Sequence, residues 1–165
     1  MTLCSGIAQG SYFTVSPSGL NDQNILNQAL YQVYQSGGGT VFLTSGVYDI
    51  QEQIQIGSNT VLTGSPGAIL RVHPFSITNY PDGTGVIGFI GDSTNNVEIS
   101  NFEIDGNIEN QPSGYHGTGY ERLINFWCDS GNPGSNISIQ DMYIHDSAGD
   151  GVQVCFAKYI FLIIK

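Results

Sequence analysis

The stretch SGGGTVFLTSGVYDI, residues 36–50, decides the fold that we predict for this chain. Glycine separates short runs of β-branched and aromatic residues there, a pattern that is typical of brief strands joined by tight turns. Similar short runs follow at 54–56, 61–62 and 69–72 and continue to the end of the 165 residues. Strands this short favour a solenoid, in which every coil adds strands to several parallel sheets, over a sandwich or a doubly wound sheet.

The segment before this stretch has the periodicity of an amphipathic helix. Apolar residues recur at helical spacing from Ile25 to Tyr34, with asparagine and glutamine between them. Asp22 is the expected N-cap and Gly37 the expected C-terminal stop. We expect this helix to cover the N-terminal end of the coils. A short strand and the helix then occupy residues 12–36 of a single domain, 1–165, whose coils occupy residues 40–165.

An internal repeat supports the coiled arrangement. NNVEISNFEID at 95–105 aligns without a gap on SNISIQDMYIH at 135–145, and the apolar residues fall at the same four places in both copies. The pattern describes two strands joined by a tight bend, with alternate side chains pointing inward. Weaker copies begin at 59 and 158, so the starts lie 36, 40 and 23 residues apart. Three asparagines at the starts of copies are expected to be turn or ladder residues: Asn59, Asn96 and Asn136.

The strands that precede each copy and the segments between them complete the predicted coil. Strands are expected at 86–90, 123–127 and 152–154, each shortly before a copy of the repeat. If 23 residues are the bare coil, the longer coils carry loops at 73–85 and 106–121. Loops on a rigid scaffold are where functional residues are expected.

Composition excludes several classes of partner. The chain has four basic and fourteen acidic residues, so the formal net charge is −10. Nucleic acid and anionic membranes require a cationic surface, so neither is predicted as a partner, and no apolar run is long enough for membrane insertion. A polyanionic substrate would need a bridging divalent cation. The three cysteines have irregular spacings that fit neither a disulfide framework nor a zinc site, so no metal site is predicted from them.

Residues 22–72 resemble the opening of the pectate-lyase-like right-handed parallel β-helix superfamily. The likeness is carried by the helix and by GGGTVFL at 37–43, GVY at 46–48 and NTVLTG at 59–64. The resemblance implies an all-β fold, a right-handed parallel β-helix with an N-terminal capping α-helix. Members of this superfamily include lyases, hydrolases, epimerases, esterases and non-catalytic adhesins, so the fold does not decide the function.

Three later motifs resemble most closely the disaggregatase-related β-helix surface proteins of methanogenic archaea. They are FEIDGN at 102–107, GTGY at 117–120 and HDSAGDG at 145–151. Disaggregatase degrades a matrix polysaccharide that holds cells together. The resemblance therefore implies an extracellular or cell-surface protein with a polysaccharide as its partner.

Candidate catalytic residues lie where the repeat meets its loops. Asp105 and His145 hold equivalent positions in the two aligned copies, one step after an inward isoleucine, so both should project outward from one sheet. If their coils are adjacent, their Cα atoms lie about 4.8 Å apart. Glycoside hydrolysis uses a carboxylic acid and a carboxylate. Asp105 with Asp146 or Asp150 is the candidate pair, with His145 tuning the pKa of the acid, and which carboxyl is the acid stays open. Each aspartate also fits a plain turn residue.

Candidate substrate-binding residues cluster around the second long loop. His116 stands between glycine and Tyr115, with Tyr120 close by, in a composition that suits contacts to sugar hydroxyl groups. Trp127 is either a stacking platform for a sugar ring or a core residue. Arg122 completes the candidate substrate-binding residues.

Three functions stay open at this point. Hydrolysis of an extracellular polysaccharide, with no cofactor required, leads. A non-catalytic cell-surface or adhesin-like module is the alternative from a different class. A calcium-dependent polysaccharide lyase ranks third: Asp105, Asp146 and Asp150 would hold Ca²⁺ through oxygen ligands, and the base would be Arg122 or Lys158.

The C-terminal residues 159–165, YIFLIIK, begin like another repeat but lose its alternation. A solenoid needs a polar cap at each end because an open strand edge pairs with other chains. We therefore expect either a truncated copy of a longer β-helix protein, or self-association or continuation through the uncapped C-terminal end.

Overall fold

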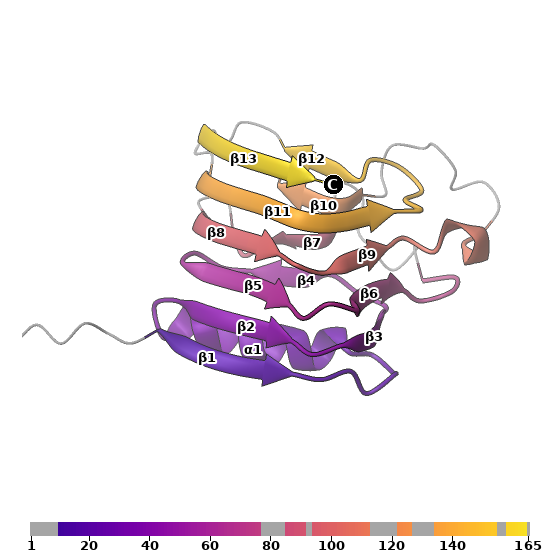
Figure 1. Cartoon of the computed structure of the whole chain (residues 1–165), viewed down its shortest axis with the longest axis horizontal. Coiled ribbons are helices and arrows are strands. Elements are labelled where there is room, and N and C mark those ends of the chain that lie inside the picture. Colours follow the sequence, from indigo (N-terminus) through magenta and orange to yellow (C-terminus); the bar gives the residue numbers. More distant parts are fainter. Residues whose placement is uncertain are drawn as a thin grey trace, which may run out of the picture.

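The chain winds in successive turns that place strand upon strand (Figure 1). The computed structural model describes residues 10–76, 85–91, 94–112, 122–126, 134–154 and 158–164; for 158–164 it describes the backbone alone. Every strand pairing in these residues is parallel, and the strands form three faces around one core. This mostly β architecture, with one α-helix in the described residues, agrees with the predicted all-β class.

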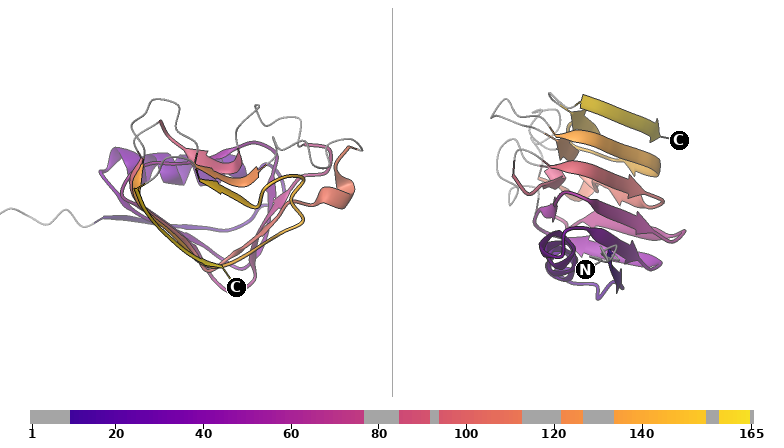
Figure 2. Two further views of the ribbon diagram at one scale, coloured as in Figure 1. Left: turned by 90° about the horizontal axis from the view of Figure 1, so that it is seen from above. Right: turned by 90° about the vertical axis from the view of Figure 1, so that its left-hand side faces the viewer.

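The strands are assigned to the faces as follows. Face 1 contains β1 (Ser11–Val15), β2 (Gly39–Leu43), β5 (Thr60–Gly64), β8 (Asn95–Ser100), the first half of β11 (Ser135–His145) and β13 (Lys158–Ile164). Face 2 contains β3 (Gly46–Ile50), β6 (Ala68–Val72), β9 (Glu103–Asp105) and the second half of β11. Face 3 contains β4 (Ile54–Ile56), β7 (Gly85–Phe89), β10 (Arg122–Phe126) and β12 (Val152–Val154). Because β11 runs through both, faces 1 and 2 form one nine-stranded sheet, and Figure 2 shows the faces end-on.

The repeat in the sequence corresponds to the register of the strands, because residues at equivalent positions of the aligned copies pair with one another. Ser135 pairs with Asn95 and His145 with Asp105, as the gapless alignment predicts, and Lys158 pairs with Ser135. The copy expected to start 36 residues before Asn95 is shifted by one position, because Thr60 pairs with Val97. Thr60 is fully buried, so it takes the inward position that Val97 has in the next coil.

Inward positions of all three faces form one hydrophobic core. Seven of the eight apolar repeat residues are buried, and Ile144 packs partly buried against them. The extra residue between the second and third apolar positions is Asn101 in one copy and Asp141 in the other, with φ of 65° and 52°. A left-handed residue there turns the chain from face 1 to face 2, as the bend in the pattern predicts.

Asparagines line one corner of the stack as a ladder. Asn59, Asn96 and Asn136 have φ of 60°, 57° and 55°. The side-chain amide of Asn136 donates to Asn96 Oδ1 at 2.8 Å, and that of Asn96 donates to Asn59 Oδ1 at 2.8 Å. The prediction of turn and ladder residues is confirmed.

The helix α1 (Gln23–Gln35) lies at the N-terminal end of the stack, behind β1 and β2 in the view of Figure 1, and packs against β4. Leu26, Leu30 and Val33 are buried against the core, whereas Ile25 and Tyr34, also expected on the apolar face, are 46% and 38% exposed. No helix in the described part of the chain has the length and apolar character needed to cross a membrane.

Asp22 precedes this helix, but its carboxylate does not cap it. Asp22 lies in the αR region, and its carboxylate accepts hydrogen bonds from the backbone N–H groups of Ser18, Gly19 and Asp49 instead. Asp22 thus holds the predicted N-cap position, but its side chain makes no capping hydrogen bond. Asp22 ties the segment before the helix to β3.

Candidate functional site

A column of charged side chains crosses face 2 near the ends of its strands. Asp49, Arg71, Asp105 and His145 are register partners in four successive strands, β3, β6, β9 and β11. Each follows an inward residue and therefore leaves the sheet on its outer surface. The predicted adjacency of Asp105 and His145 is confirmed, and Arg71 lies next in the same column.

Asp105 is the fixed centre of the column. It is 7% exposed. Arg71 Nε lies 2.7 Å from its Oδ2, and the backbone N–H of Asn107 donates to its Oδ1 at 2.7 Å. The left-handed Asn107, with φ of 51°, turns the chain back so that its N–H meets the carboxylate. Both oxygens of Asp105 are thus engaged by donors.

His145 lies between two carboxylates. Its Nε2 is 3.1 Å from Glu103 Oε1 and its Nδ1 is 2.9 Å from Asp146 Oδ2. The ring of Tyr143 stacks on the imidazole with centroids 4.4 Å apart and planes 24° apart. Burial alone would lower the pKa of His145, but the hydrogen bonds to Asp146 and Glu103 and the charge of Asp105 raise it above its usual value. The imidazolium form donates to both carboxylates.

We name these residues the His145 cluster: Arg71, Glu103, Asp105, His145 and Asp146. An open cavity of about 290 Å³ lies beside the cluster. It is lined by Arg71, Asp105, Asn107, Ile108, Glu109, Asn110 and Asp146. A ligand in this cavity can reach the cluster from solvent.

A metal ion could be held by part of the cluster. Glu103, Asp105 and His145 each offer one donor atom, and these atoms lie within 4.8 Å of one another. Two of the three are the carboxylate oxygens that calcium prefers, and the third is an imidazole nitrogen, which it does not. Asp150 does not belong to this group, so the three aspartates predicted as calcium ligands are not gathered in the described residues.

The structure places two further predicted residues together elsewhere. Asp150 Oδ2 lies 3.9 Å from Arg122 Nε, at the start of β10 on face 3. The side chain of Asp150 is 59% exposed and that of Arg122 is 12% exposed. Asp105, His145 and Asp146 thus come together as predicted, and Asp150 joins Arg122 instead. Four predicted residues lie outside the described part of the chain: Tyr115, His116, Tyr120 and Trp127.

Sequence reasoning missed three residues at the His145 cluster or in contact with it: Arg71, Glu103 and Tyr143. Glu103 and Tyr143 hold the outward position two residues before Asp105 and His145 in the same aligned copies, so the rule that selected the latter pair also applies to them. Arg71 lies in the weaker copy, and its pairing with Asp105 depends on the length of the intervening loop.

Comparison with known proteins supports the fold. No model of a known protein family matches the sequence, and no curated protein matches it. Among solved structures, the A-module of the mannuronan C-5 epimerase AlgE4 of Azotobacter vinelandii is similar, with a TM-score of 0.66 and 17% identity over 87% of this chain and 42% of that one. The A-module of AlgE6 from the same organism has a TM-score of 0.61 and 18% identity, over 93% and 40%.

These two modules share the parallel β-helix fold, which agrees with the predicted architecture. The chain spans about two fifths of the length of the modules it matches. At this identity the likeness concerns the fold alone, and it does not bear on the resemblance to archaeal surface proteins.

Proposed function

We propose that this protein acts on an extracellular or cell-surface polysaccharide at the His145 cluster, and that the reaction is hydrolysis of a glycosidic bond. The observation that carries this proposal is the register that places Asp105 beside His145, with Glu103 and Asp146 around the imidazole and an open cavity alongside. The resemblance to disaggregatase-related proteins and the fold shared with polysaccharide epimerase modules support a glycan as substrate. We also infer that the coils form a right-handed solenoid, as in the superfamily that the chain resembles.

The roles within the cluster follow from its contacts. Retaining hydrolysis places two carboxyl groups about 5 Å apart, one as the nucleophile and one as the acid. The nearest oxygens of Glu103 and Asp105 lie within 4.8 Å. Asp105, which Arg71 and a backbone N–H hold, is assigned as the nucleophile: its oxygen bonds to the anomeric carbon as the glycosidic bond breaks, and water then releases the sugar from the carboxylate. The proton that the departing oxygen takes is assigned to the Glu103–His145 pair, in which His145 Nε2 lies 3.1 Å from Glu103 Oε1.

Product analysis tests this proposal. The purified protein is incubated with neutral and uronic polysaccharides, with and without calcium, and both new reducing ends and the absorbance of unsaturated uronates are followed. New reducing ends that disappear in Asp105→Asn and persist in Asp150→Asn support hydrolysis at the cluster. Asp150 is the matched control because it is a loop aspartate that contacts Arg122 instead. Unchanged activity of Asp105→Asn would contradict the proposal.

Chemistry on a uronate is the second candidate. Arg71 is the specific observation that favours it, because its guanidinium lines the cavity, where it could neutralise a substrate carboxylate. This residue replaces Arg122, which pairs with Asp150, as the candidate cation. Calcium-dependent absorbance would indicate a lyase. A change in sugar configuration, seen by proton NMR without new reducing ends, would indicate an epimerase like those that share the fold.

The non-catalytic alternative makes a separate prediction. A surface or adhesin-like module would bind a glycan without forming any product. Retained binding in the absence of reducing ends, absorbance and configurational change would therefore favour it over both reactions.

A further inference from the structure

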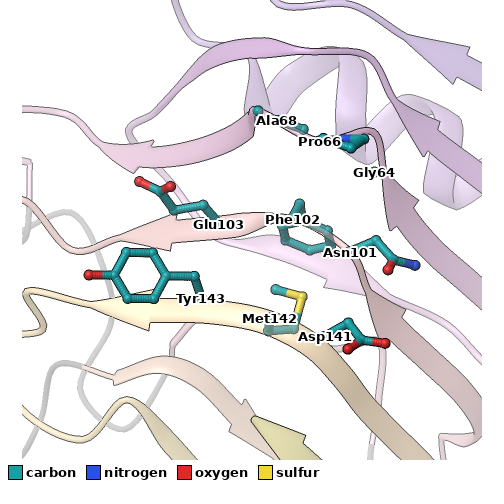
Figure 3. Close-up of a pocket in the computed structure, with 10 residues that line it drawn as sticks. Gly64, Pro66, Ala68, Asn101, Phe102, Glu103, Asp141, Met142 and Tyr143 are labelled. Atoms are coloured by element: carbon teal, nitrogen blue, oxygen red, sulfur yellow. The ribbon is translucent and has the colours of Figure 1, made fainter. Parts of the chain in front are cut away.

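A second, larger hollow lies at the bend between faces 1 and 2. It has a volume of about 520 Å³ and crosses three successive coils (Figure 3). It is lined by Gly64, Pro66, Gly67, Ala68, Asn101, Phe102, Glu103, Asp141, Met142 and Tyr143. We call this hollow the bend groove. Of the described residues, the coil nearest the N-terminus contributes glycine, alanine and proline to this lining, so small side chains create the depression.

The bend groove borders the His145 cluster, with which it shares Glu103. Glu103 and Tyr143 line the groove and also contact His145, through the 3.1 Å hydrogen bond and the ring stack. A ligand in the groove therefore touches the same side chains that hold the imidazole. One polysaccharide chain can thus occupy the groove and reach the cluster.

The lining of the groove is suited to a sugar ring. Tyr143 is 57% exposed, and its stacking on His145 holds the ring in place, so little conformational entropy is lost when a ligand packs on it. Phe102 and Met142 lie between Tyr143 at one end and Asn101 and Asp141 at the other (Figure 3). Phe102 and Met142 are buried and form the floor, whereas exposed apolar surface comes from Tyr143 and Pro66. Together with the exposed polar groups of Asn101 and Asp141, this surface matches the C–H faces and hydroxyl groups of a pyranose.

Charge decides which sugars fit. Among the residues that the structure describes, no lysine, arginine or histidine lines the groove, whereas Glu103 and Asp141 do, on a chain of net charge −10. These carboxylates repel an anionic sugar and accept hydrogen bonds from hydroxyl groups. We propose that the bend groove binds a neutral pyranose residue of the polysaccharide, with Tyr143 as its platform. This inference rests on the proposed function, since the same glycan chain is to reach the cluster.

Calorimetric titration tests the proposal without turnover. Asp105→Asn protein is titrated with hexasaccharides of glucose, mannose and galactose, and with a mannuronate hexasaccharide. We expect a neutral hexasaccharide to bind more tightly than the mannuronate one. Adding Tyr143→Ala should weaken that binding about tenfold, whereas Tyr143→Phe should keep it within about twofold. Tyr31→Ala, which removes a comparably exposed tyrosine on α1, is the matched control and should change nothing.

A second measurement uses the unsubstituted chain. The methyl signals of Ala68 and Met142 should shift when the binding hexasaccharide is added, while that of Ala29 in α1 should not. Unchanged affinity in Tyr143→Ala, unchanged groove methyl signals, absence of binding by every neutral hexasaccharide, or preference for the mannuronate one would each overturn the inference.

The two proposals fail in different ways. Tyr143-dependent binding with no product on any glycan would leave the neutral-sugar groove standing and remove hydrolysis. Hydrolysis that depends on Asp105 while binding ignores Tyr143 would do the reverse.

Discussion

Asp105 and His145 are paired residues of neighbouring parallel strands, and both side chains leave the outer surface of face 2. Asp105 is one of three carboxylates whose charges or hydrogen bonds act on the imidazole; Glu103 and Asp146 are the others. When His145 is protonated, the column alternates in sign from Asp49 through Arg71 and Asp105 to His145. Opposite charges on adjacent strands of a sheet stabilise the pairing, so this column supports the coils as well as any reaction.

The pKa of His145 should be measurably raised. Because the pKa is higher in the folded chain than in the unfolded one, its contribution to stability is complete below about pH 6.5 and is lost as the pH rises through the folded pKa. Titration of the imidazole Cε1 proton by NMR measures the value directly. Glu103→Gln and Asp146→Asn should each lower it, because each removes one hydrogen-bonded charge. Asp150→Asn should leave it unchanged, and an equal decrease in that control would contradict the assigned contacts.

Gly106 should be required for the geometry of the cluster. A side-chain carbon there would overlap the carbonyl oxygen of Asp146, since the two coils approach closely at this point. Gly106→Ala should therefore lower the free energy of unfolding by about 1–3 kcal/mol in urea denaturation. Gly151→Ala is the control, because its added carbon would meet Ile144 at an ordinary contact distance of 3.4 Å. Equal losses in both variants would argue against the close approach.

The part of the site that could be predicted is the part that the repeat contains. Apolar periodicity separates inward from outward positions, and a gapless alignment places Asp105 beside His145 without knowledge of any loop. Arg71 could not be placed in this way, because the segment between β6 and β9 sets its partner. Its pairing with Asp105 becomes visible only when the register is known.

The prediction that Asp150 lies with Asp105 and His145 was based on its closeness to His145 in the sequence. Asp150 follows His145 by five residues, but β11 ends at His145 and the chain then turns towards β12 on face 3. Short coils move a residue from one face to another within a few positions. The bends at Asn101 and Asp141, in contrast, could be predicted from the sequence. Each adds one residue between two inward-pointing apolar positions, so it appears as a break in the alternation of apolar and polar residues.

Asn27 should stabilise the N-terminal end of the stack. Its side-chain amide donates to the carbonyl of Gln53 at 2.8 Å, and its Oδ1 accepts from the N–H of Gln55 at 2.9 Å. The side chain thus forms hydrogen bonds with the backbone of Gln53 and of Gln55 in β4 that a neighbouring strand would otherwise make. Asn27→Leu should cost about 1 kcal/mol in thermal or urea unfolding. Asn24→Leu, an exposed site on the same helix, should cost little, and a comparable loss there would point to helix propensity instead.

Acid should weaken the fold through Asp22. Burial alone would raise the pKa of this carboxyl, but hydrogen bonds from Ser18, Gly19 and Asp49 hold the pKa below its usual 3.8. A lowered pKa means that the stabilisation is complete above about pH 4 and is lost as the pH falls through the folded pKa. Thermal melts from neutral pH to about pH 2 should therefore show a falling midpoint.

Asp22→Asn separates this residue from other acids. The substitution replaces an acceptor oxygen with a donor among buried N–H groups, so it should cost about 1–3 kcal/mol at neutral pH. It should also flatten, without abolishing, the decline of the melting temperature in acid, because Asp49 has a lowered pKa as well. Glu52→Gln, at an exposed site between β3 and β4, is the control and should keep both the neutral stability and the full acid slope. An unchanged slope in Asp22→Asn would assign the acid sensitivity to other carboxyl groups.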